Sequence, residues 1–147
     1  MGNRKGFTLI ELIAVVVIMA IIALLATPNI IGLLEKGKKE EFVADAKEFV
    51  SKASYQYRSE KFNKDNQNEE KEYKLVDIKG VNNDDLVGPW GKEYSKDDGV
   101  SIDYNNGTIT YKITLTTDDK SHKTYKFDGV KKEDINIDNI TVTEKGK

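Results

Sequence analysis

The chain has 147 residues, 38% of them hydrophobic, which suffices for one domain with a modest core. Its 23 Lys and Arg residues nearly balance its 25 Asp and Glu residues, so it lacks the basic excess typical of nucleic-acid binders, and we expect no direct nucleic-acid binding. It contains no cysteine, which excludes disulfide bonds, Cys–His nucleophiles and thiolate zinc sites.

The first element is an apolar run from Phe7 to Thr27, preceded by Arg4 and Lys5. As a helix, its 21 residues span roughly 31 Å, close to the hydrocarbon thickness of a bilayer. The positive-inside rule keeps the basic pair in the cytoplasm, so the rest of the chain is exported. A cleavable secretory signal peptide fits less well, because Leu24 is too large for the third position before a cut after Ala26.

A single carboxylate, Glu11, lies inside this run and distinguishes it from a plain signal anchor. A carboxylate one turn inside a lipid-facing helix costs roughly 2.5 to 3.5 kcal/mol, and intramembrane acids usually have a partner. The apolar run itself offers no cation. Cleavage after Gly6 would give Phe7 a new α-amino group, four residues before Glu11.

The stretch from Lys5 to Glu11, KGFTLIE, resembles the class III signal sequence of type IV pilins and the related pseudopilins. The resemblance implies that residues 1–6 are a leader, that a prepilin peptidase cuts between Gly6 and Phe7, and that the new amine of Phe7 is methylated. It also implies that residues 7–28 form a membrane anchor that becomes the filament core. Glu11 would then pair with the Phe7 amine of an adjacent subunit.

The helix is expected to kink at Pro28, which lacks a backbone donor and crowds the preceding turn. In the resembled family, a proline at this spacing marks where the helix extends when the filament forms. Residues 29–58 are amphipathic, with apolar side chains every three or four positions and too few heptads for a coiled coil. The predicted buried stripe consists of Leu34, Phe42, Val43, Ala46, Phe49, Val50, Ala53 and Tyr57.

Residues 59–147 are predicted to form a globular head. Arg58–Glu72 is almost wholly polar, which predicts an exposed connection. A short apolar-rich piece follows, from Tyr73 to Ile78, and Asn82–Asp85 interrupts it.

The next feature is Gly88–Pro89–Trp90–Gly91, followed by Tyr94. Two glycines and a proline predict a structural turn, and the only tryptophan is expected to fill an edge of the core rather than bind carbohydrate. The cluster also resembles the Asp-Pro-Trp-Gly-x-x-Tyr stretch of major pseudopilins and some short pilins, with Gly88 in place of the aspartate.

The periodicity becomes two from Val100 to Phe127, which predicts an antiparallel meander with one apolar face. Val100–Tyr104 is expected to be a strand, Asn105–Gly107 a hairpin turn, Ile109–Leu115 the returning strand, and a third strand begins at Tyr125. The tail is a fourth strand or a packed segment, with apolar residues Ile135, Ile137, Ile140 and Val142.

No catalytic constellation is evident. The only histidine, His122, lies in a polar turn and is expected to be solvated, and no phosphate-binding loop marks an ATPase. Weak calcium candidates are Asp97, Asp98, Asp118 and Asp119, whose oxygens suit a hard cation, although EF-hand spacing is absent and hydrogen-bonded turns and solvation explain them more simply. We expect no other metal or cofactor.

These patterns predict an α+β pilin-like fold, a long N-terminal helix whose amphipathic half packs on a small antiparallel sheet. The expected function is a non-enzymatic type IV pilin subunit that polymerises into an extracellular pilus for adhesion, motility or biofilm formation. The alternatives are a major pseudopilin of a type II secretion or DNA-uptake apparatus, and a membrane-anchored enzyme or binding module that would retain residues 1–6.

The resemblance also implies the partners and the location of the chain. The partners would be other copies in a helical homopolymer, the prepilin peptidase, an assembly ATPase and an inner-membrane platform. The precursor would be a single-pass protein of the cytoplasmic membrane with its N-terminus inside, and the mature subunit would leave the membrane for the extracellular filament.

Overall fold

The computed structural model describes residues 6–61 and 69–144, apart from the side chains of residues 26–29. The chain divides into two compact units, one ending at Gly37 and the other beginning at Lys38. Four short 3-10 turns accompany the regular elements, which are helix α1 (Leu9–Lys61) and strands β1 (Glu69–Lys74), β2 (Gly99–Asn105), β3 (Thr108–Asp118), β4 (Lys123–Lys131) and β5 (Thr141–Glu144).

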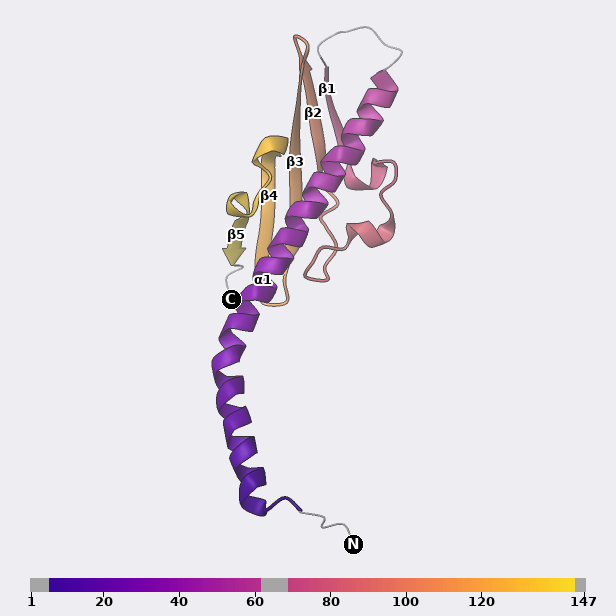
Figure 1. Cartoon of the computed structure of the whole chain (residues 1–147). Coiled ribbons are helices and arrows are strands. Elements are labelled where there is room, and N and C mark those ends of the chain that lie inside the picture. Colours follow the sequence, from indigo (N-terminus) through magenta and orange to yellow (C-terminus); the bar gives the residue numbers. More distant parts are fainter. Residues whose placement is uncertain (1–5, 62–68, 145–147) are drawn as a thin grey trace. The chain divides into compact units, whose positions relative to one another are not determined.

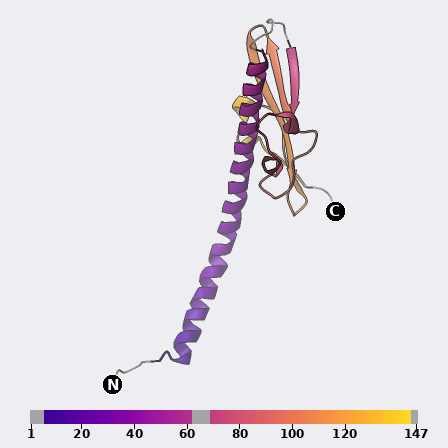
Figure 2. The same ribbon diagram turned by 90° about the vertical axis from the view of Figure 1, so that its right-hand side faces the viewer.

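The five strands form one sheet in the order β1-β2-β3-β4-β5, with every neighbouring pair antiparallel (Figure 1). From Lys38 onward, α1 lies across one face of this sheet, and the view along the sheet shows the two layers (Figure 2). The predicted α+β class, with a long N-terminal helix and an antiparallel sheet, is therefore confirmed.

The amphipathic stripe of α1 forms the helical side of the core, as its spacing predicts. Phe42, Ala46, Val50 and Ala53 have no exposed surface, and the other stripe residues from Val43 to Tyr57 are also buried. The prediction is wrong for Leu34, whose side chain is 61% exposed. Leu34 belongs to the first unit, before the helix meets the sheet, so its place in the periodicity does not bury it.

The core between helix and sheet is rich in aromatic rings. The Phe42 ring stacks on Phe127 of β4, with 5.0 Å between centroids and planes 3° apart. Tyr94 contacts both Phe42 and Phe49. Offset and edge-to-face aromatic pairs add roughly 0.5–1.5 kcal/mol beyond the burial of their area. These rings hold the helix against β4 at Phe42 and against the segment before β2 at Phe42 and Phe49.

The predicted connection Arg58–Glu72 is partly wrong, because α1 continues to Lys61 and β1 already begins at Glu69. On β1, Lys71 and the Tyr73 hydroxyl both donate to the Glu60 carboxylate of α1, the hydroxyl at 2.9 Å. The Lys71 hydrogen bond lowers the pKa of Glu60 to about 2. Long polar side chains thus join β1 to the helix, and a search for alternating apolar residues does not detect a strand of this kind.

The sheet has one irregularity, opposite Thr114 of β3. Ile113 pairs with Val130 and Leu115 with Phe127, so two residues of β4 face Thr114 alone. One of these is Gly129, whose positive φ of 61° suits a bulge. The β2–β3 turn has positive φ at Asn106 and Gly107, as the hairpin prediction requires.

The tail contributes both to the sheet and to the core. Ile135 is buried, and Thr141–Glu144 pairs with β4 as the fifth strand. The sequence predicted three strands and left open whether the tail is a fourth strand or a packed segment. In the structure the tail forms β5 at one edge of the sheet, and β1, which was not predicted, lies at the other edge.

Candidate assembly site

The N-terminal part of α1 presents an apolar surface on all its sides. Every large apolar side chain from Leu9 to Leu25 is exposed, from 51% for Val15 to 76% for Leu24. A helix that is hydrophobic all round normally lies inside a larger core or a membrane.

No single helix among the described residues meets the length and hydropathy expected of a membrane span. One bent pair, Leu9–Leu25 with Ile30–Lys61, meets both together.

Thr8 and Glu11 form a reciprocal capping box at the start of α1. The Thr8 backbone N–H and hydroxyl each donate to the Glu11 carboxylate at 2.8 Å, and the Glu11 N–H donates to the Thr8 hydroxyl oxygen at 3.3 Å. This box satisfies backbone donors that a helix start otherwise leaves without partners. The sequence signal was Thr-x-x-Glu immediately before an apolar run, and the pairing interpretation of Glu11 overlooked it.

Gly6 and Phe7, the predicted cleavage pair, precede the helix. Both are exposed, with Phe7 at 90%, and neither belongs to a helix or strand. A Cβ built on Gly6 would meet nothing within 4 Å, so no contact of the chain with itself requires glycine here. A requirement for glycine at this place must therefore come from another molecule.

Pro28, the predicted kink, lies inside the range of α1. Its side chain is outside the described residues, so the kink stays a prediction. The leader residues 1–5 are likewise outside the described residues.

Gly88–Gly91 forms a turn in which the Gly91 N–H donates to the Gly88 carbonyl at 2.8 Å. Trp90 is only 7% exposed. Its ring stacks on Tyr125, with centroids 3.9 Å apart and planes 13° apart, and it meets Phe42 edge-on. One face of the indole is thus occupied by a core tyrosine, and little of the ring remains for a carbohydrate.

The departure from the resembled pattern at Gly88 has a steric reason. A Cβ at this position would come within 2.9 Å of the Thr117 hydroxyl and 3.1 Å of the Tyr94 ring. Thr117 is 2% exposed and cannot easily yield. An aspartate in the same position would require this part of the core to rearrange.

We expect Gly88→Ala to lower the free energy of unfolding of the head by about 1–3 kcal/mol, because it overpacks this contact. Urea unfolding of the full chain in detergent, followed by Trp90 fluorescence, measures the change. Gly37→Ala is the matched control, since a Cβ at that helical glycine meets nothing within 4 Å. Equal stability of both variants would show that the Gly88 contact is not tight.

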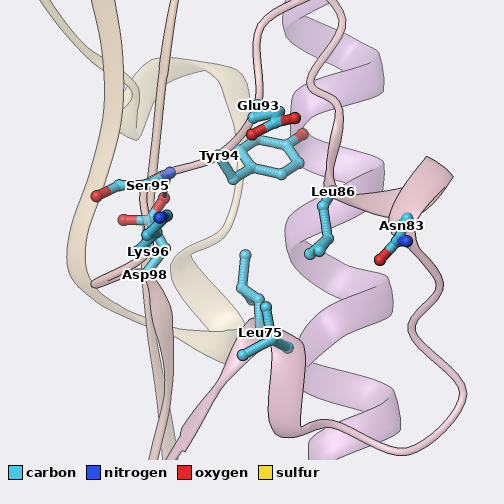
Figure 3. A pocket seen from close by; sticks show the side chains of 9 residues that line it. Leu75, Asn83, Leu86, Glu93, Tyr94, Ser95, Lys96 and Asp98 are labelled. Atoms are coloured by element: carbon cyan, nitrogen blue, oxygen red, sulfur yellow. Dashed lines mark hydrogen bonds between the residues drawn. The ribbon is translucent and has the colours of Figure 1, made fainter.

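A hollow of about 370 Å³ lies beside this turn, between Leu75, Leu86 and the Tyr94–Asp98 segment (Figure 3). Leu75 and Leu86 point into it, while the Tyr94 hydroxyl points towards α1 and donates to Asp45. Its lining combines three aliphatic side chains and the Tyr94 ring with the polar residues Asn83, Glu93, Ser95, Lys96 and Asp98. No catalytic arrangement is present among these lining residues.

Asp98, a weak calcium candidate, serves as a backbone anchor at the edge of this hollow. It is 2% exposed, and its Oδ2 accepts the N–H groups of Ser95 at 3.0 Å and Thr116 at 2.6 Å. Burial raises its pKa to about 6 in spite of these hydrogen bonds. Because both bonds reach Oδ2, a proton on Oδ1 leaves them in place.

The other three calcium candidates do not join Asp98 in one group. Asp97 pairs with Lys74 at 3.3 Å, Asp118 accepts the Thr124 hydroxyl, and Asp119 accepts two N–H groups of its own turn. The described part of the chain contains no group of three Asp, Glu, His or Cys side chains placed to hold a metal. Calcium binding stays a prediction.

The raised pKa of Asp98 predicts a pH-dependent stability. In an unfolded chain the pKa of aspartate is near 3.9, so the contribution of Asp98 is fully present below about pH 4 and is lost as the pH rises through about 6. Relative to Asp98→Asn, we expect the wild type to lose up to about 3 kcal/mol of unfolding free energy between pH 4 and 7. Urea unfolding of both proteins at each pH tests this, and parallel pH profiles would contradict it.

Comparison with known proteins gives matches to the N-terminal segment. Residues 1–27 match the family described as the prokaryotic N-terminal methylation motif. Type II secretion system core protein G of Klebsiella pneumoniae is 40% identical over 45 residues, which are 31% of this chain and 32% of that protein. Its counterpart in Escherichia coli K12 is 42% identical over 43 residues, 29% of this chain and 30% of that protein.

The counterpart in Dickeya chrysanthemi is 42% identical over 43 residues, 29% of this chain and 28% of that protein. This chain therefore matches about a third of the length of these curated relatives. No solved structure matches the chain. The segment that the family match covers, residues 1–27, contains the predicted cleavage pair, the capping box and the exposed apolar surface of α1.

Proposed function

We propose that this chain is a pseudopilin-like subunit of a secretion or DNA-uptake apparatus, because it carries the N-terminal methylation motif and resembles the type IV pilin and pseudopilin family. Its role is structural, as in that family. The observation that carries the proposal is the apolar surface of α1 from Leu9 to Leu25, exposed on all sides behind a processing motif. Lipid covers it in the precursor, and the helices of other copies cover it in the filament.

The chemistry of assembly follows from the helix start. A prepilin peptidase cuts between the exposed Gly6 and Phe7, and the new Phe7 amine is methylated. The Glu11 carboxylate, which caps its own helix through Thr8 in this structure, then also meets the Phe7 amine of a neighbouring copy. Pairing the two charges offsets part of the cost of burying each of them and fixes the register of adjacent helices.

Exchanging lipid for protein around α1 brings no hydrophobic gain, since lipid tails are as apolar as the side chains they leave. Packing between helices and the Glu11 pair must hold the filament together. Extraction of the subunit therefore needs work from a separate machine, and the assembly ATPase and membrane platform of the resembled family would supply it.

The pseudopilin assignment has two supports over a surface pilus. The relatives named above are core proteins of type II secretion systems. The stretch from Gly88 to Tyr94 resembles a stretch of major pseudopilins, which some short pilins share, apart from Gly88 in place of the aspartate, and in this chain it is built into the head core through Trp90. A surface pilus for adhesion or motility, our first expectation from the sequence, is now the second candidate.

Deletion of the coding sequence in the native host separates the two candidates. We expect loss of protein secretion or of DNA uptake, with no change in long surface filaments. Expression of the wild-type chain in the deletion strain should restore secretion or uptake. Long filaments that disappear with the chain, while secretion and uptake continue, would contradict the pseudopilin proposal and support the pilus.

A further inference from the structure

The sheet face turned away from α1 carries two pairs of like charges in unfavourable positions. Strand register places Glu70 of β1 directly opposite Asp103 of β2, and Lys112 of β3 directly opposite Lys131 of β4. All four residues are exposed. Like charges directly opposite each other on neighbouring strands destabilise a sheet.

These four side chains share one face of the sheet. Asp103 alternates with the buried Ile102, and Lys112 lies between the buried Tyr111 and Ile113, so both point away from the core. Glu72, two residues after Glu70, extends the acidic pair on the same face. The face therefore holds an acidic patch (Glu70, Glu72 and Asp103) beside a basic patch (Lys112 and Lys131).

The two patches do not neutralise each other within one copy. Asp103 and Lys112 are diagonal neighbours across β2 and β3, yet no ion pair joins them in the described residues. Other lysines of this sheet do have acidic partners, for example Lys126 with Asp128 at 3.2 Å and Lys74 with Asp97 at 3.3 Å. The two like-charged pairs thus differ from these other charged residues of the sheet, which have partners of opposite charge.

We propose that this face binds the same face of a second copy of the chain, with the acidic patch of each head against the basic patch of the other. The two patches lie side by side, so a two-fold axis parallel to the strands satisfies both contacts at once. The remaining outward residues of β2 to β4 are largely serine and threonine, for example Ser101, Thr110 and Thr114. A polar face of this kind favours a wet, weak and salt-sensitive contact.

This contact is separate from the assembly site, because it uses the sheet of the second unit and not the apolar surface of α1. It connects the heads of two copies, in addition to the contacts between their apolar helices. In detergent micelles the apolar helix of the full-length chain is covered while its sheet remains free. A missing contact between sheets can therefore be distinguished from a failure of filament assembly.

The test is sedimentation velocity of the full-length chain in detergent, with one chain per micelle. We expect the wild type to self-associate at about 0.02 M salt and to be monomeric at about 0.5 M, where the Debye length is only a few ångströms. Glu70→Lys with Asp103→Lys, and Lys112→Glu with Lys131→Glu, should each weaken association at least about tenfold.

Mixing the two double variants supplies the decisive result. Each variant alone presents two patches of the same net sign, since the two introduced lysines outnumber Glu72. The mixture presents opposite net signs on partner heads, so association should return. Lys96→Glu with Lys120→Glu is the matched control, because both lysines are exposed and lie outside the strands. Wild type that stays monomeric at low salt, or a mixture that does not associate, would overturn the proposal.

A single variant separates the contact from a structural role. Glu70→Lys creates a cross-strand ion pair with Asp103, so the head should melt at a higher temperature while self-association becomes weaker. If Glu70 served the fold of the monomer, the same change would lower the melting temperature, and that result would count against the proposed contact.

Discussion

Replacing Glu11 by valine is expected to leave cleavage and membrane insertion intact and to reduce filament yield to a small fraction. Valine removes the carboxylate that would meet the Phe7 amine of a neighbouring copy, and it makes the helix more compatible with lipid. Processed protein should accumulate in the membrane. Immunoblots of membrane and sheared filament fractions, with the mature mass determined in parallel, measure both effects.

The capping box at the start of α1 provides a control for this prediction. Glutamine at the same position of a capping box still accepts from the helix start, so Glu11→Gln keeps the contacts with Thr8 but removes the charge. We expect Glu11→Gln to fail like Glu11→Val. Thr8→Ala removes the capping hydroxyl, at a cost of about 1 kcal/mol in helix stability, and leaves the carboxylate, so it should still assemble.

Wild-type filament yield from Glu11→Gln would show that Glu11 acts only as a cap. Failure of Thr8→Ala together with success of Glu11→Gln would do the same. Either pattern contradicts the charge pairing between neighbouring copies, without affecting the assignment of the fold.

Phe42→Ala is expected to lower the free energy of unfolding of the head by about 3–5 kcal/mol. The Phe42 ring is fully buried, stacks on Phe127 and contacts Trp90 and Tyr94, so its removal leaves a cavity at the centre of the helix–sheet contact. For a small domain this is a large share of the total stability. Urea unfolding of the full chain in detergent, monitored by tryptophan fluorescence, measures it.

Tyr55→Ala on the same helix is the control. Its side chain is 78% exposed, so the change should stay within about 0.5 kcal/mol of the wild type. Similar losses in Phe42→Ala and Tyr55→Ala would mean that the helix does not pack on the sheet through the predicted stripe.

Regular periodicity made the helix and the central strands predictable. The stripe from Phe42 to Tyr57 has the spacing of a helix, and the alternation around Val100–Leu115 has that of strands, because in both the core selects the apolar side chains. Strand β1 was not predicted because its sequence, EEKEYK, has no apolar alternation. It contacts the helix through the Lys71 amine and the Tyr73 hydroxyl, which both donate to Glu60.

The long-range polar hydrogen bonds of the head could not be predicted from the sequence for a different reason. Asp98 accepts an N–H from Thr116, 18 residues away, and Tyr94 donates to Asp45, 49 residues away. No local pattern specifies such pairs, and the Asp97-Asp98 dipeptide indicated only a hydrogen-bonded turn or, more weakly, a calcium ligand. The helix start differs, because Thr8 and Glu11 are local and their spacing already signalled a cap.

A processed filament subunit begins at Phe7, two residues before the start of α1 at Leu9. Mass spectrometry of the intact chain purified from its native host, with fragmentation of the N-terminal peptide, tests whether this chain is processed. We expect a mature chain that begins at Phe7 and carries one methyl group on the Phe7 amine. A mature chain that retains residues 1–6 would contradict the proposed processing and the filament role that depends on it.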